Sequence, residues 1–136
     1  MSNTENSDAA IRTSIAPWLS VQNGATAVDF YKAAFGAVET YRLEMPDGSL
    51  VVKLSVNGAE FWISGDSASD DPIPAPVGGG IVKIVLTVAD PDTLFEKALA
   101  AGAIEIFPVG EDYGWRLGRL ADPFGLHWEI GYPLAN

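Results

Sequence analysis

The stretch Leu19-Ser20-Val21-Gln22-Asn23 has a counterpart in Leu86-Thr87-Val88-Ala89-Asp90, and the spacing between them, 86 minus 19, is 67 residues. The same spacing relates later parts of the chain, since 125 minus 58 and 128 minus 61 also give 67. A repeat of this length predicts a duplicated supersecondary unit. A chain of 136 residues, 48% of them hydrophobic, has room for two such units in one domain.

Each repeat is predicted to form a strand, a helix and three further strands. Alternating apolar residues indicate strands, whereas apolar residues at helical spacing precede Gly36. Asn23 and Asp90 are the predicted N-caps, and Gly36 is where the first helix is expected to end. The predicted strands are 15–21, 38–44, 50–56 and 59–64 in the first repeat and 81–88, 104–109, 113–120 and 126–131 in the second, where the helix spans 91–101.

The composition between and before the repeats sets the expected boundaries. Small polar residues open the chain, and Ser, Asp, Pro and Gly dominate the stretch between the repeats, which is either a plain linker or a lip over a site. We expect a disordered N-terminal tail over 1–13, a first βαβββ unit over 14–65, a linker over 66–80 and a second βαβββ unit over 81–133.

The charge of the chain narrows the classes of partner. Eighteen acidic residues against eight Lys and Arg give a formal net charge of -10, which disfavours nucleic acid and anionic membrane surfaces as partners. The chain contains no Cys, so thiolate metal sites and thiol catalysis are excluded. No apolar run is long enough for a membrane-spanning helix and no signal peptide is recognised, and we expect a cytoplasmic protein.

Three segments carry a resemblance to a known family: Val28 to Ala37, Leu99 to Ala103, and Asp122-Pro123-Phe124-Gly125-Leu126-His127-Trp128-Glu129-Ile130. With the repeat, they resemble the vicinal oxygen chelate superfamily, which includes glyoxalase I, bleomycin-resistance proteins, fosfomycin-resistance proteins and extradiol dioxygenases, and within it the PhnB-like glyoxalase-related subgroup. The resemblance implies an α+β fold in which two tandem βαβββ units form a curled mixed sheet around a cleft, with helices on the convex face.

The resemblance also implies where a metal would be held. The positions that match the metal ligands of metal-dependent relatives are Ala16, Trp62, Lys83 and Glu129, and only Glu129 can ligate a divalent ion. We therefore expect no metal and no cofactor, although Glu129 with His127, the single histidine, leaves a weak two-ligand site open. Because an unpaired carboxylate in a cleft is costly, the sequence predicts an ion pair between Lys83 and Glu129.

Strand alternation assigns a set of side chains, Ser20 and Ser64 among them, to the cleft and Phe61, Ile63, Trp128 and Ile130 to the core. The tryptophans of this set either stack a ligand or fill the cleft floor or a dimer seam. His127 is either a general base or a hydrogen-bonded structural residue. The predicted ligand-binding residues are Trp18, Trp62, Lys83, Trp115, Arg119, His127 and Glu129, and no residue is assigned a catalytic role.

These features predict a metal-free protein that binds an aromatic or cationic small molecule in a Trp-lined cleft. In architecture it would resemble the bleomycin-resistance proteins. Lys53, Lys83 and Arg119 would also tolerate a carboxylate on the ligand. The alternatives are a metal-dependent lyase, isomerase or dioxygenase of the same superfamily, or an interaction protein whose cleft is closed by packing. Relatives commonly pair, so we expect a homodimer, with a cleft formed either within one chain or by exchange of units between two.

Overall fold

The computed structural model describes residues 11, 13–66 and 82–135. The predicted tail, apart from Ile11 and Thr13, and the predicted linker, apart from Asp66, lie outside the described residues. The boundaries expected for these two segments therefore stay predictions.

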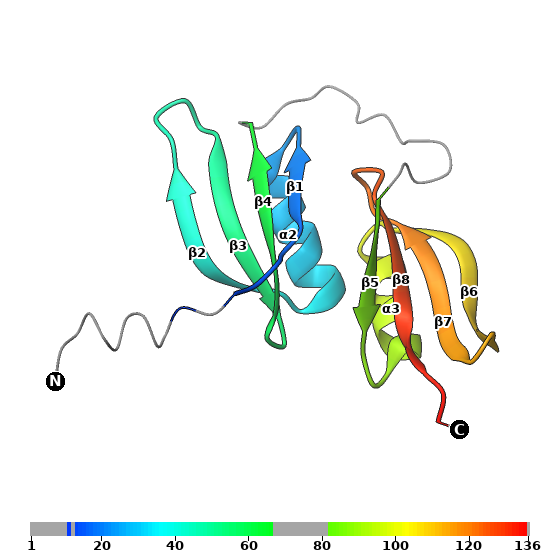
Figure 1. The fold of residues 1–136 in the computed structure, drawn as a ribbon. Coiled ribbons are helices and arrows are strands. Elements are labelled where there is room, and N and C mark those ends of the chain that lie inside the picture. Colours follow the sequence, from blue (N-terminus) through cyan, green and yellow to red (C-terminus); the bar gives the residue numbers. More distant parts are fainter. Residues whose placement is uncertain (1–10, 12, 67–81, 136) are drawn as a thin grey trace, which may run out of the picture.

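The first unit contains β1 (Trp18–Val21), α2 (Gly24–Phe35), β2 (Val38–Glu44), β3 (Leu50–Val56) and β4 (Ala59–Gly65), and its sheet has the order β1-β4-β3-β2. The second contains β5 (Lys83–Thr87), α3 (Pro91–Ala100), β6 (Ile104–Asp112), β7 (Trp115–Ala121) and β8 (His127–Pro133), in the order β5-β8-β7-β6. In both sheets the first strand pairs in parallel with the last, and the other pairs are antiparallel. Figure 1 shows the two sheets, each with its own helix. The predicted α+β fold of two tandem βαβββ units is confirmed.

The helix ends follow the capping residues that the sequence predicts. The Asn23 side chain accepts a hydrogen bond from the Thr26 N–H at 3.1 Å, and Asp90 accepts one from the Thr93 N–H at 3.3 Å. Each bond satisfies an N–H that has no partner within the helix. Gly36 ends α2 at a φ of 69°, which glycine adopts without strain.

The largest differences from the predicted strand boundaries lie at the turn between β6 and β7 and at the start of β1, and the other strand ends agree to within two residues. Tyr113, predicted to start a strand, instead lies in the two-residue turn that joins β6 to β7, with a φ of 50° followed by 81° at Gly114. Two consecutive positive φ values match the twist of a tight hairpin, so β6 extends to Asp112. β1 begins at Trp18, after Pro17, which has no N–H for a strand ladder.

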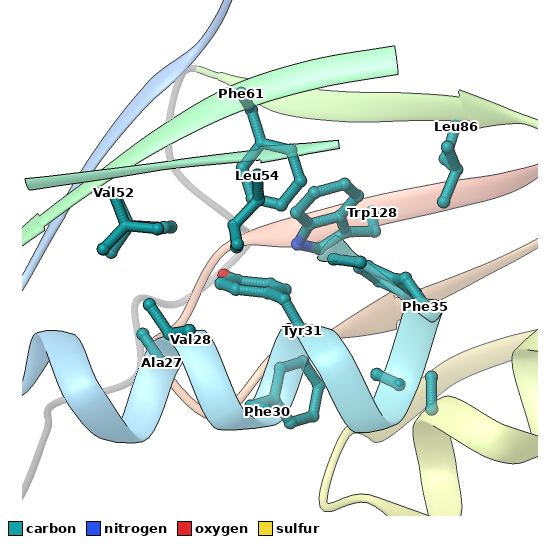
Figure 2. Packing of buried hydrophobic residues seen from close by; sticks show 14 of the residues in the cluster. Ala27, Val28, Phe30, Tyr31, Phe35, Val52, Leu54, Phe61, Leu86 and Trp128 are labelled. Atoms are coloured by element: carbon teal, nitrogen blue, oxygen red, sulfur yellow. The ribbon is translucent and has the colours of Figure 1, made fainter. Parts of the chain in front are cut away.

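One hydrophobic core spans both units. Tyr31 and Phe35 of α2 pack against Phe61 of β4 and Trp128 of β8, with ring centroids 5.2 Å apart for Tyr31 and Phe61 and 4.7 Å apart for Phe35 and Trp128 (Figure 2). The residues predicted to form the core from their strand positions, namely Phe61, Ile63, Trp128 and Ile130, are all buried. The helices thus cover one face of the sheets and leave the other open for a site.

A buried carboxylate joins the units at the centre of this core. Asp122, 2% exposed, follows β7 and accepts hydrogen bonds from the backbone N–H groups of Phe124 and Leu126 and from the Trp128 indole N–H. The Tyr31 hydroxyl of the first unit donates a fourth. Burial, reinforced by the negative charge of Asp122, raises the pKa of Tyr31 well above its usual value, so this hydroxyl keeps its proton and remains a donor.

The outer edge strand β2 carries a row of ion pairs. Glu39 contacts Lys32 at 2.7 Å and Arg42 at 3.1 Å, and Arg42 also contacts Glu44 at 2.7 Å. Charged side chains of this kind discourage other strands from pairing with an exposed edge. Within the described part of the chain, neither helix is long and apolar enough to cross a membrane.

Removing the Asp122 carboxylate should destabilise the whole domain. Asp122→Ala leaves four donors without their acceptor, and we expect the free energy of unfolding to fall by about 3 kcal/mol or more; Tyr31→Phe should cost about 1–3 kcal/mol. Urea denaturation followed by circular dichroism measures both. Tyr113→Phe, at a tyrosine that is 95% exposed, is the matched control and should change stability by less than about 0.5 kcal/mol. An Asp122→Ala variant as stable as the wild type would contradict the expectation.

Candidate functional site

The open face of the first sheet carries three aromatic rings and one lysine, which together we name the aromatic shelf: Trp18, Tyr41, Lys53 and Trp62. The strand register places Trp18 opposite Trp62, and their rings stack with centroids 5.5 Å apart. Tyr41 packs edge-on against Trp62, and the Lys53 ammonium lies 5.1 Å from the centre of the Trp62 ring. Trp18 remains 53% exposed, so the shelf offers a flat apolar surface.

Hydrogen bonds fix the Trp18 ring of the aromatic shelf. The Trp18 indole N–H donates to Ser64 Oγ at 2.9 Å, and the Ser20 and Ser64 hydroxyls lie 3.4 Å apart. Both serines are on the open face of their strands, where alternation predicts them. The indole plane is therefore held in place before any ligand arrives.

The second sheet carries a hollow of about 490 Å³, which we name the β6–β8 hollow. This volume lies in the range of small-molecule sites, about 300–1,000 Å³. Three aromatic rings and three carboxylates contribute to its wall, and none of the described lining residues is Lys or Arg. The lining residues are Phe107, Pro108, Gly110, Glu111, Asp112, Tyr113, Trp115, Leu117 and Glu129.

Glu129 lines the hollow and lies between two cations. Its Oε2 accepts from Lys83 Nζ at 2.8 Å and from Arg119 at 2.6 and 3.2 Å, and its side chain is only 14% exposed. The predicted Lys83–Glu129 ion pair is confirmed. Burial by itself raises the pKa of Glu129, but the hydrogen bonds from Lys83 and Arg119 outweigh it and hold the pKa below its usual value.

The strand register explains why these groups meet. Phe107 of β6, Arg119 of β7 and Glu129 of β8 are directly paired across the sheet. Side chains in such a row share one face, so the Arg119 guanidinium also lies over the Phe107 ring, 5.4 Å from its centre. Arg119 therefore links the carboxylate to an aromatic wall.

His127 lies on the same face of β8 as Glu129 by strand alternation, opposite Lys83 and Ala121 in the register. It is 6% exposed, and its Nδ1 atom has no hydrogen-bond partner among the described residues. His127 is not one of the residues that line the β6–β8 hollow. No described residue orients its ring for proton transfer, as a general base would require.

The predicted site residues thus fall into two groups on two sheets. Trp18 and Trp62 belong to the aromatic shelf, whereas Lys83, Arg119, Glu129 and Trp115 belong to the second sheet, where Glu129 and Trp115 line the hollow. Their roles as ligand-binding residues stay predictions. Sequence reasoning missed the side chains of Tyr41, Phe107, Glu111, Asp112 and Tyr113.

The residues at the family's metal positions do not fit a metal ion. Ala16 has no donor atom, the Trp62 indole can only donate, and Lys83 is a cation bound to the remaining carboxylate. A divalent ion on Glu129 would meet the repulsion of two positive charges already bound at Oε2. Within the described ranges, moreover, no three His, Asp or Glu side chains form a group that could hold a metal.

The low pKa of Glu129 predicts a specific pH dependence. The ionised carboxylate stabilises the folded protein above the usual glutamate pKa of 4.5, and this contribution is lost as the pH falls through the lower, folded-state value. The stability difference between wild type and Glu129→Gln should therefore be largest near pH 7 and shrink below pH 4.5. Urea denaturation at a series of pH values tests this. Glu111→Gln, at a more exposed carboxylate, is the control, and a difference for Glu129→Gln that does not change with pH would contradict it.

Comparison with known proteins agrees with this architecture. An uncharacterised protein of Mycobacterium tuberculosis (strain ATCC 25618 / H37Rv) is 40% identical over 133 residues, which cover 93% of this chain and 78% of that protein. The crystal structure of a glyoxylase/bleomycin resistance protein/dioxygenase domain from Frankia sp. EAN1pec has a TM-score of 0.71 at 16% identity, covering 91% of this chain and 99% of that one. A PhnB protein from Bacillus cereus has a TM-score of 0.64 at 21% identity, covering 90% of this chain and all of that one (100%). The family model described as "Glyoxalase/Bleomycin resistance protein/Dioxygenase superfamily" matches residues 13–130, and the chain belongs to that superfamily.

Proposed function

We propose that this protein binds an aromatic or cationic small molecule in a Trp-lined cleft without the help of a metal, in the manner of the bleomycin-resistance type. The observation that carries the proposal is that the Glu129 carboxylate is ion-paired with two cations. Glu129 is the one family ligand position with a carboxylate, and Lys83 and Arg119 both donate to its Oε2 beside a hollow with aromatic walls. The described residues of this site offer a binding surface, and among them we identify no complete set of catalytic groups.

The charges of the hollow favour a cation over an anion. Glu111 and Asp112 line it together with Glu129, and the positive charge of Lys83 and Arg119 is directed at Glu129. An aromatic cation would gain both stacking on Trp115 and attraction to the carboxylates. A carboxylate on the ligand would meet like charges at the rim.

We further propose that two copies of the chain pair as a homodimer. The open faces of both sheets expose large apolar side chains, among them Trp18, Tyr41 and Leu43 on the first and Val85 and Phe107 on the second. Apolar surface gathered on an open sheet face is typical of a surface that another element covers. A second copy would bring an aromatic shelf or a hollow against these faces.

The subgroup of the protein, its location in the cell and the classes of partner that it lacks are also proposals. Membership of the PhnB-like subgroup rests on the three segments Val28 to Ala37, Leu99 to Ala103 and Asp122 to Ile130 taken together. The proposed location is the cytoplasm. The formal net charge of -10 argues against nucleic acid and anionic membrane surfaces as partners.

The titration that tests binding uses 10-methylacridinium, a flat aromatic cation. Its addition should quench the tryptophan fluorescence of the protein saturably, because Trp115 lines the hollow. Trp115→Ala should weaken binding about five- to tenfold, since it removes a stacking wall. Ile15→Ala, at an exposed residue outside the strands, is the control and should leave the affinity unchanged. A flat titration with this cation and with a panel of other aromatic cations would overturn the proposal.

Light scattering tests the homodimer. The wild type should have twice the mass of one chain, and Leu43→Glu, which places a charge on the open face of the first sheet, should shift the protein towards monomer. Glu96→Gln, on the exposed side of α3, is the control and should remain dimeric. A wild-type protein that is monomeric at working concentration would contradict the expectation.

Metal analysis tests the alternative of a metal-dependent enzyme. Protein purified without chelator and without an affinity tag should carry no stoichiometric transition metal, because three of the four family positions lack a ligating atom. Stoichiometric Ni, Zn, Mn or Fe would instead favour a lyase, isomerase or dioxygenase.

A further inference from the structure

The two oxygens of Glu129 are used unequally. Lys83 and Arg119 both donate to Oε2, at 2.8 Å and 2.6 Å for their closest atoms. The other oxygen, Oε1, accepts no hydrogen bond from a described residue, although Glu129 lines the β6–β8 hollow. A carboxylate oxygen can accept two hydrogen bonds, so Oε1 has its full capacity left for a ligand.

The surroundings make this oxygen a strong and fixed acceptor. The side chain is only 14% exposed, and two ion pairs hold its orientation. A hydrogen bond to an ionised group shielded from water is stronger than one between neutral groups in solvent. The low pKa of Glu129 keeps the oxygen charged at neutral pH.

The shape and charge of the hollow restrict what can reach Oε1. Aromatic side chains from β6 and β7, including Phe107 and Trp115, form its walls, which suits a flat ring system. Glu111 and Asp112 contribute negative charge to the same hollow. The molecule that fits is planar and positively charged.

We propose that the β6–β8 hollow selects planar heteroaromatic cations that carry an N–H donor, and that Glu129 Oε1 accepts that hydrogen bond. This inference rests on the proposed binding function and adds a specificity-determining residue to it. A position that would bind a metal in metal-dependent relatives here recognises an N–H of the ligand.

Two probes separate the hydrogen bond from charge and stacking. Both 9-aminoacridine and 10-methylacridinium are flat three-ring cations at pH 7, but only the first has N–H groups. Isothermal titration calorimetry with the wild type should give at least about tenfold tighter binding for 9-aminoacridine, the gain expected of a hydrogen bond to a charged acceptor. Because the probes carry the same charge, the ratio of their dissociation constants cancels the coulombic contribution.

Two variants locate the effect. Glu129→Gln replaces the charged acceptor by a neutral amide, so the ratio between the probes should fall to within about threefold. Glu111→Gln also removes one negative charge from the hollow but leaves Glu129 in place, so both probes should bind more weakly while their ratio stays as in the wild type. Circular dichroism confirms that each variant is folded.

The outcomes distinguish this inference from the proposed function. A ratio near one in the wild type, with saturable binding of both probes, would show that Glu129 does not select ligands by their N–H donor. The proposed binding function would still stand. A ratio that survives Glu129→Gln likewise overturns this role of Glu129. Failure of both probes to bind overturns the role of Glu129 in selecting them, and the titration with the wider panel of aromatic cations then decides the binding function.

Discussion

A carboxylate that is 2% exposed is tolerated inside a protein only when its oxygens accept hydrogen bonds, and Asp122 receives its donors from both units. The Tyr31 hydroxyl comes from α2, whereas the Trp128 indole and two backbone N–H groups come from the second unit. The bonds to Phe124 and Leu126 shape the turn into β8, the strand that carries Glu129. The site therefore depends on a core contact that neither unit can complete alone.

The two units share one topology but present different chemistry on their open faces. The first offers stacked indoles with an ammonium over one of them, and the second offers a carboxylate held between two cations beside a hollow. Equivalent positions of the two repeats place their side chains on the open face of each sheet, although the residue types differ. Trp62 and Glu129 are such a pair, since 129 minus 62 is 67. A duplicated fold can thus supply two unlike half-sites.

Properties that depend on local order along the chain were predictable from sequence. The repeat follows from a constant spacing along the chain, and the caps at Asn23 and Asp90 and the alternation that separates Trp62 from Phe61 follow from neighbouring residues. Contacts across strands were harder, because they depend on register and on irregularities such as those of β6. The ion pair between Lys83 and Glu129 was predictable because both residues match metal-ligand positions of the family and because an unpaired carboxylate in a cleft is costly. Phe107 and Tyr113 were missed, since their places follow from the register of β6 and the turn at Tyr113 and Gly114.

The ion pairs along β2 have a consequence for how copies of this protein associate. A strand added at that edge would meet the charges of Glu39, Arg42 and Glu44, which are already neutralised by one another and by Lys32. Fibre-like growth through backbone pairing is therefore disfavoured there. The proposed homodimer would instead form through side chains on the sheet faces, and such a closed assembly would stop growing once those faces are covered.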